Sequence, residues 1–282
     1  MTGTAPTAPA ERTITIETAD RVATITLRRP EVLNALDSHT HRAIAQAIVD
    51  LERDDEVAAI VIAAEGRAFC SGSDLREIGQ LAGAAEQEYV ALDFSTKNRI
   101  ATCTKPVVAA IQGYCVGGGM ELALACDLRV AADDAIFAMP EVSLGSLPGS
   151  GGLQRLPQVV GVGIAKEWIL TGRRVPADEA HVRGLVNTVV PRDRLAEAAH
   201  DLAADLARKS PLALRLAKVA LTPEPLADRG LVAAFQMLAG DATHSQPSYS
   251  SATRRFSSPG SGAGDTQSER PTGPLAPRER SE

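Results

Sequence analysis

Three consecutive glycines, Gly117 to Gly119, separate a strand-like segment from a helix-like segment, and this arrangement constrains the fold of the 282-residue chain most. The preceding residues 106–111 read Pro-Val-Val-Ala-Ala-Ile, which is typical of a buried strand. A turn is predicted at Gly113-Tyr114, and a helix is predicted to begin near Gly118. A buried strand that passes through a turn into a helix is a building unit of α/β folds.

The rest of the chain extends this alternation through about its first half. Strands are predicted at 13–17 and 22–27, which form a hairpin, and at 57–63, 128–131 and 135–137. One predicted helix is capped by Asp37 or Ser38 and buries Ile44, Ile48 and Leu51, and another covers 84–100. Beyond Gly149 the pattern is mainly helical, with helices near 153–157, 164–170, 177–183, 195–208, 212–220 and 231–239 and a short strand at 186–190. The sequence therefore predicts an α/β core followed by a helical region.

The composition excludes several classes of function. Aromatic residues make up only 3% of the chain and the net charge is −6, whereas nucleic-acid binders concentrate Lys and Arg and often stack bases on aromatic rings. The four cysteines form no CxxC pair and have no nearby His at metal-ligand spacing, so we expect no metal site and reduced thiols in a cytoplasm. We expect neither a signal peptide in residues 1–11 nor a membrane span.

The glycine run also places a carboxylate beside a potential anion site. A first-turn N–H of a helix that begins near Gly118 points toward developing negative charge, as an oxyanion donor does. Glu121 follows three residues later on the same side of that turn. Taken alone, however, a Glu in the first turn of a helix is more simply a residue that stabilises the helix dipole.

A second acid stands beside glycines in Met139-Pro140-Glu141, ahead of a Gly-rich stretch that includes Gly149, Gly151 and Gly152. Two carboxylates that face one cavity can divide acid and base roles, because each raises the pKa of the other. The sequence leaves open whether Glu121 and Glu141 face each other.

A third segment, Ala68 to Leu75, follows a strand and offers another amide donor ahead of a helix capped by Ser73 or Asp74. The rival interpretation makes Cys70, Ser71 or Ser73 a nucleophile. Nucleophilic catalysis needs a base, and the candidates nearest in sequence, His39 and His41, are predicted to be exposed on a helix.

Together these segments resemble the enoyl-CoA hydratase/isomerase, or crotonase, superfamily over about residues 13–243. The matching motifs occur in the family's order: Arg29-Pro30, Asn34-Ala35-Leu36, Phe69, Gly72-Ser73-Asp74-Leu75, Gly117-Gly118-Gly119, Glu121, Pro140-Glu141, Pro148-Gly149, Gly151-Gly152 and Gln154-Arg155. The resemblance implies a spiral of ββα turns followed by a helical C-terminal region that supports homotrimers or hexamers.

The resemblance also implies the site. The backbone N–H groups of Ser73 and Gly118 would form the oxyanion hole, and the substrate-binding residues would be Ser73, Asp74, Leu75, Arg76, Gly118 and Gly149. Glu121 and Glu141 would be catalytic: Glu121 would activate water and Glu141 would protonate the α-carbon of a 2-trans-enoyl-CoA. No cofactor is implied, because coenzyme A enters as part of the substrate. The alternatives are an isomerase, a decarboxylase, a thioester hydrolase, or an impaired homologue that only binds acyl-CoA.

The chain departs from the family pattern at its C-terminus. Family members usually end in a helix with a basic finish, whereas residues 247–282 are rich in Ser, Gly, Pro, Arg and Thr. Codons for 247–265 can be chosen so that another frame reads a family-like ending, and we therefore favour a change of reading frame over a genuine flexible tail. The predicted organisation is a disordered head at 1–11, a crotonase-like core at 12–190, a helical region at 191–246 and a disordered tail at 247–282.

Overall fold

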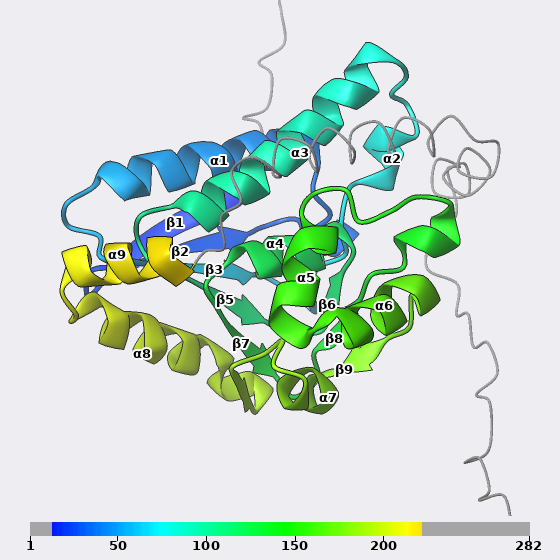
Figure 1. The fold of residues 1–282 in the computed structure, drawn as a ribbon. Helices are drawn as coiled ribbons and strands as arrows, with labels where there is room; N and C mark the ends of the chain where they lie inside the picture. The colour runs from blue at the N-terminus through cyan, green and yellow to red at the C-terminus, as the bar shows by residue number, and fades with distance from the viewer. Residues whose placement is uncertain (1–12, 222–282) are drawn as a thin grey trace, which may run out of the picture.

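The computed structural model describes residues 13–221, and within them two sheets share one spiral of strands and helices (Figure 1). The predicted head at 1–11, helix at 231–239 and tail at 247–282 lie outside the described residues. The larger sheet has the order β1-β2-β3-β5-β7-β10, antiparallel between β1 and β2 and parallel elsewhere. Its strands are β1 Ile14–Ala19, β2 Val22–Leu27, β3 Ala59–Ala64, β5 Val107–Ile111, β7 Leu128–Ala132 and β10 Thr188–Val190.

The smaller sheet has the order β4-β6-β8-β9, in which the first three strands are parallel and β9 is antiparallel to β8. These strands are β4 Ala68–Cys70, β6 Tyr114–Val116, β8 Ile136–Ala138 and β9 Val175–Pro176. Each pair β3/β4, β5/β6 and β7/β8 gives one strand to each sheet before the chain continues into helix or 3-10 helix. The predicted spiral of ββα turns is therefore confirmed.

Helices cover both faces of the larger sheet. On one side, α1 packs against α3, and on the other side α8 contacts β3, β5 and β7 (Figure 1). The helices are α1 Ser38–Arg53, α2 Leu75–Ile78, α3 Ala84–Thr102, α4 Gly118–Ala125, α5 Gly152–Val160, α6 Val162–Thr171, α7 Ala177–Val182, α8 Leu195–Ala207 and α9 Pro211–Leu221, with short 3-10 helices η1 Pro30–Val32, η2 Glu141–Leu144 and η3 Arg192–Arg194.

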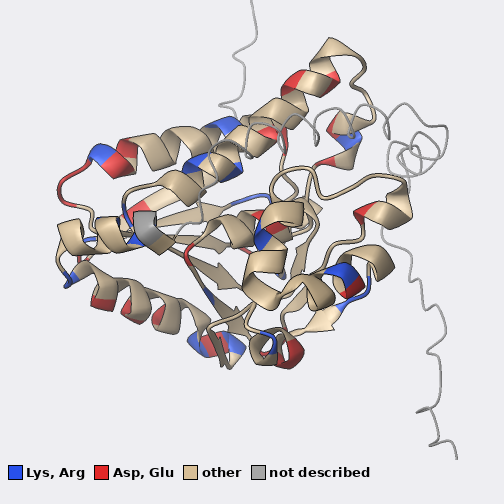
Figure 2. Cartoon of the chain, in the orientation of Figure 1, with Lys and Arg blue, Asp and Glu red and all other residues tan. Residues whose placement is uncertain are grey.

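Residue spacing explains why α8 lies on the sheet. Its buried residues Leu195, Ala199, Ala203 and Ala207 recur every four positions, which is one face of a helix. They pack with the face of the larger sheet that includes Val61 and its neighbours. The charged residues of α8 lie along its outer side, while the strands are almost free of charge (Figure 2).

Several predicted boundaries need correction. The predicted turn at Gly113-Tyr114 contains the start of strand β6, Tyr114–Val116, which is too short to show a period. Helix α5 runs from Gly152 to Val160 and so continues past Pro157. Strand β10 begins at Thr188, two residues later than predicted. Asp37 rather than Ser38 caps α1, because its carboxylate accepts from the N–H of Thr40 at 2.7 Å.

Candidate active site

Three parallel strands of the smaller sheet lead directly to the predicted site residues. Ser73 follows the end of β4 by three residues, Gly118 follows β6 by two, and Glu141 follows β8 by three. Because β4, β6 and β8 are neighbours and parallel, their carboxyl ends lie at the same edge of the sheet. The topology therefore brings together three positions that are distant in the sequence.

The backbones of Ser73 and Gly118 lie close together at this edge. A Cβ placed on Gly118 would lie 3.2 Å from the backbone nitrogen of Ser73. The N–H of Gly118 opens α4 and has no acceptor within its own helix. On either side of Ser73, the Gly72 carbonyl accepts from the N–H of Leu36 and the N–H of Asp74 donates to the Leu36 carbonyl, at 2.8 and 2.9 Å. Successive N–H groups of an extended chain alternate in direction, so the N–H of Ser73 points away from Leu36.

Gly119 is required by the packing of α4. A Cβ at this position would lie only 2.3 Å from the carbonyl oxygen of Cys70, which belongs to β4. Real Cβ atoms do not approach backbone so closely, and a side chain would therefore push α4 away from β4. This close contact fixes the first turn of α4 against the segment that carries Ser73.

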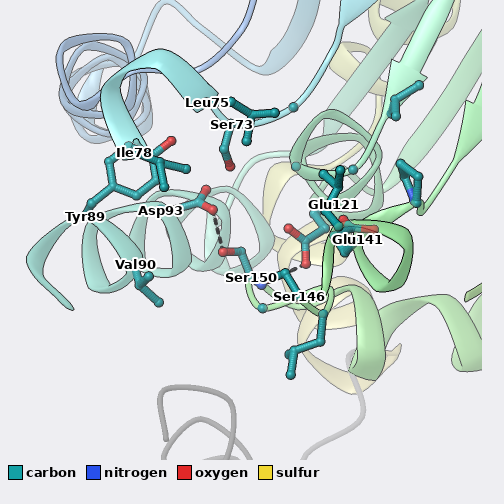
Figure 3. A pocket seen from close by; sticks show the side chains of 18 of the residues that line it. Ser73, Leu75, Ile78, Tyr89, Val90, Asp93, Glu121, Glu141, Ser146 and Ser150 are labelled. Carbon is teal, nitrogen blue, oxygen red and sulfur yellow. Dashed lines mark hydrogen bonds between the residues drawn. The ribbon is translucent and has the colours of Figure 1, made fainter. Parts of the chain in front are cut away.

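A cavity opens between α3, α4 and the segments that follow β4 and β8 (Figure 3). Its lining includes most of the predicted site together with apolar side chains from α2 and α3: Ser71, Gly72, Ser73, Leu75, Ile78, Glu86, Tyr89, Val90, Asp93, Val116, Gly117, Gly118, Glu121, Pro140, Glu141, Leu144, Ser146, Leu147, Gly149 and Ser150. Two predicted substrate-binding residues lie outside this lining. Asp74 caps α2 and pairs with Arg29 at 3.0 Å, and Arg76 is exposed.

Glu121 is buried in α4 and is held from two sides. Its Oε1 accepts hydrogen bonds from the backbone N–H groups of Ser150 at 2.7 Å and Gly152 at 2.9 Å. Its Oε2 lies 3.3 Å from Nζ of Lys97. Hydrogen bonds from N–H donors and a nearby ammonium both favour the ionised carboxylate. The structure therefore gives Glu121 the environment of a fixed anion.

Glu141 stands at the start of η2 in a contrasting environment. Both of its carboxyl oxygens are buried, and neither receives a hydrogen bond from another described residue. Burial, and next the charge of Glu121, raise the pKa of Glu141 from 4.5 to about 8. Both side chains line the same cavity and lie next to each other in Figure 3. Glu121 is thus held by two N–H donors and an ammonium, while Glu141 keeps its proton at neutral pH.

A buried polar cluster behind Glu121 was missed by the sequence analysis. Asp93 forms a short hydrogen bond with Lys97, lies 3.3 Å from Nε2 of His41 and accepts from the Ser150 hydroxyl at 2.6 Å. The four-residue spacing of Asp93 and Lys97 looks like an ordinary surface ion pair of a helix. They are buried because α3 packs between α1 and α4, and the local sequence does not show this packing.

The prediction that His39 and His41 are both exposed is wrong for His41, which is completely buried, while His39 is exposed. The signal was present in the sequence, because His41 continues the buried stripe of Ile44, Ile48 and Leu51. Burial lowers the pKa of His41 to about 4, so its ring is neutral at neutral pH.

Comparisons with known proteins identify the family. The enoyl-CoA hydratase/isomerase family model matches residues 17–246. The chain belongs to this family. It is 42% identical over 209 residues to the probable enoyl-CoA hydratase echA8 of Mycobacterium bovis, covering 74% of this chain and 80% of the relative. It is 37% identical over 224 residues to the short-chain-enoyl-CoA hydratase of Clostridium acetobutylicum, covering 79% and 86%. The crystal structure of an enoyl-CoA hydratase from Bacillus anthracis superposes with a TM-score of 0.74 at 36% identity, covering 81% of this family member and 90% of that chain.

Proposed function

We propose that this family member is an enoyl-CoA hydratase, which adds water reversibly to a 2-trans-enoyl-CoA and gives a 3-hydroxyacyl-CoA. The observation that carries the proposal is the unequal pair of carboxyl groups, Glu121 and Glu141, in one cavity beside two adjacent backbone amides. Hydration needs such a pair, because water must lose a proton while the α-carbon gains one. The match to relatives named as hydratases supports the same reaction.

The two amides would bind the thioester. In this proposal the N–H groups of Ser73 and Gly118 donate to the thioester oxygen, and coenzyme A runs past residues 73–76 and Gly149. Negative charge grows on this oxygen as the enolate forms, and one donor of an oxyanion hole is typically worth about 3 kcal/mol. Coenzyme A is then part of the substrate, and the proposed chemistry uses no separate cofactor.

The proton transfers follow from the two environments. Glu121 accepts a proton from water as the oxygen bonds to the β-carbon, and the π electrons shift toward the thioester to give the enolate. Glu141, whose pKa of about 8 keeps it protonated at neutral pH, then donates its proton to the α-carbon. Exchange of one proton with solvent at each carboxyl restores the starting state. General acid and base catalysis of this kind contributes on the order of 100-fold or more per group.

The test follows the loss of enoyl-thioester absorbance with crotonyl-CoA and longer 2-trans-enoyl-CoAs, with identification of the product. Glu121→Gln and Glu141→Gln are each expected to lower turnover by about 100-fold or more with an unchanged circular dichroism spectrum. Glu88→Gln is the matched control, because Glu88 is exposed on α3 and lies outside the cavity lining. Turnover like the wild type in either active-site variant would refute the assignment.

We also propose that the protein is a homotrimer or a hexamer in the cytoplasm. Apolar side chains are exposed on α6, α7 and α9, including Leu170 at 71%, Val182 at 78% and Leu221 at 80%, which supports association. The four free cysteines are all buried thiols, which is compatible with a reducing compartment. Helices long and apolar enough to cross a bilayer are absent from residues 13–221. Light scattering coupled to gel filtration measures the mass; a monomer would contradict the assembly.

A further inference from the structure

Lys97 is a completely buried cation that reaches an active-site carboxylate from behind. Its side chain has an exposed fraction of 0%, and it does not belong to the lining of the cavity. Its Nζ bridges two acids, Asp93 on its own helix and Glu121 on α4, where it lies 3.3 Å from Oε2. A Cβ placed on Gly118 would also lie 3.3 Å from this Nζ. The ammonium therefore sits directly beneath the first turn of α4.

Among the described residues, the ammonium of Lys97 is the positively charged group of this buried cluster. Asp93 from α3 and Glu121 from α4 face it as carboxylates, while His41 from α1 lies beyond Asp93. The pKa of His41, lowered to about 4 by burial, leaves that ring uncharged. The Cys70 thiol from β4, whose pKa burial raises to about 12, is also neutral. Burial disfavours the charge of Lys97, but the two carboxylates outweigh it and raise its pKa.

A second path joins the same groups. The hydroxyl of Ser150 donates to Oδ2 of Asp93 at 2.6 Å, and the backbone N–H of Ser150 donates to Oε1 of Glu121 at 2.7 Å. Asp93 thus orients Ser150, whose N–H holds Oε1 of Glu121. Asp93 also pairs with Lys97, which faces Oε2 of Glu121. Figure 3 shows Asp93 and Ser150 joined by this hydrogen bond beside Glu121.

We propose that Lys97 is a positioning residue for the hydration reaction, which fixes Glu121 as the carboxylate that accepts the proton of water and leaves Glu141 as the proton donor. The inference rests on the proposed function and names the residue that assigns the two acid and base roles. An ion pair of Asp93 and Lys97 with a purely structural role would need no third partner, and buried ion pairs alone add little net stability. The contact with Glu121 is the part that a structural role leaves unexplained.

The kinetic test compares the pH dependence of kcat/KM in the wild type and Lys97→Met. Without the ammonium, Glu121 should take up its proton at higher pH. The acidic limb of the profile is expected to move up by about one pH unit or more, which lowers kcat/KM about tenfold at pH values below both midpoints. KM is expected to stay within about twofold, because Lys97 lies behind the cavity wall. Lys166→Met removes an exposed lysine of α6 and serves as the matched control.

Asp93→Asn separates positioning from structure. This variant breaks the same ion pair but leaves the cation beside Glu121, so the acidic limb should stay in place or move down. A purely structural pair predicts that Lys97→Met and Asp93→Asn behave alike, and that result would overturn the proposal. If Lys97→Met does not fold, the double variant Asp93→Asn/Lys97→Met removes both buried charges and should still show the upward shift.

A measurement without substrate keeps this proposal independent of the reaction. Infrared spectra of protein with isotope-labelled glutamate, recorded across the pH range of the acidic limb, report protonated carboxyl groups. Lys97→Met should show an added protonated glutamate signal that disappears in Lys97→Met/Glu121→Gln. Failure of every enoyl-CoA to react, with this added signal present, would refute the hydratase and keep the role of Lys97 toward Glu121. Absence of the signal would refute that role even in an active hydratase.

Discussion

Replacing Glu141 by Gln should make the protein more stable relative to the wild type as the pH rises. The carboxyl of Glu141 is buried without a hydrogen bond from another described residue, and its pKa is raised from 4.5 to about 8. Between these two values the unfolded chain releases a proton that the folded protein keeps. Ionisation in the unfolded state therefore draws the wild type toward unfolding across this window. Glutamine has no such proton.

The size of the effect follows from the width of the window. One pKa unit corresponds to about 1.4 kcal/mol, so a shift from 4.5 to about 8 gives roughly 5 kcal/mol as an upper value. Below pH 4.5 the variant and wild type should differ only by the constant effect of the side-chain replacement. The difference should then grow with pH and level off above about pH 8. Total stabilities of domains are about 5–15 kcal/mol, so the effect is large.

Urea unfolding at a series of pH values measures this difference, and the fluorescence of the single tryptophan, Trp168, which is buried, reports unfolding. Glu88→Gln, an exposed glutamate of α3, is the control and should give a constant difference from the wild type. A constant difference for Glu141→Gln between about pH 5 and pH 8 would refute the argument that burial and Glu121 keep this group protonated.

Three further outcomes are expected. Gly118→Ala places a methyl group 3.2 Å from the backbone nitrogen of Ser73 and should lower turnover by about 100-fold, measured by loss of enoyl absorbance; activity near the wild type would exclude this space as the oxyanion position. Gly119→Ala, whose Cβ would lie 2.3 Å from the Cys70 carbonyl oxygen, should cost about 3 kcal/mol in urea unfolding, whereas Gly163→Ala, with open space around it, should stay within about 0.5 kcal/mol. The four buried cysteines should react with a thiol reagent only after unfolding, and rapid labelling of the native protein would contradict their burial.

The sequence predicted the elements whose signals are local. The hairpin of β1 and β2, the cap at Asp37 and the helix that opens at Gly118 follow from alternation, capping chemistry and glycine placement, and the structure contains all three. Strand β6 was missed because it has only three residues, which is too short to show the alternation of polar and apolar side chains that indicates a strand. Strand β9 has only two residues and was missed for the same reason.

The polar cluster could not be predicted in the same way. Asp93 and Lys97 look like a solvent-exposed pair at helical spacing, and only the packing of α3 between its neighbours makes them buried. His41 is the exception, because its place in the apolar stripe of α1 already indicated burial. Glu121 and Glu141 were found through their glycine-rich surroundings, while their different environments depend on contacts from Lys97 and Ser150.

The three parallel strands β4, β6 and β8 set the spacing of the groups proposed to react with the substrate. Adjacent strands are held about 4.8 Å apart by their hydrogen bonds, so the groups that follow them inherit a fixed spacing whatever the length of chain between. Ser73 and Gly118 are joined through all of α2 and α3, yet that intervening segment does not set their separation. The stretch that includes α2 and α3 also supplies cavity walls such as Ile78 and Val90. Substrate choice can therefore vary through this stretch while the reacting groups keep their geometry.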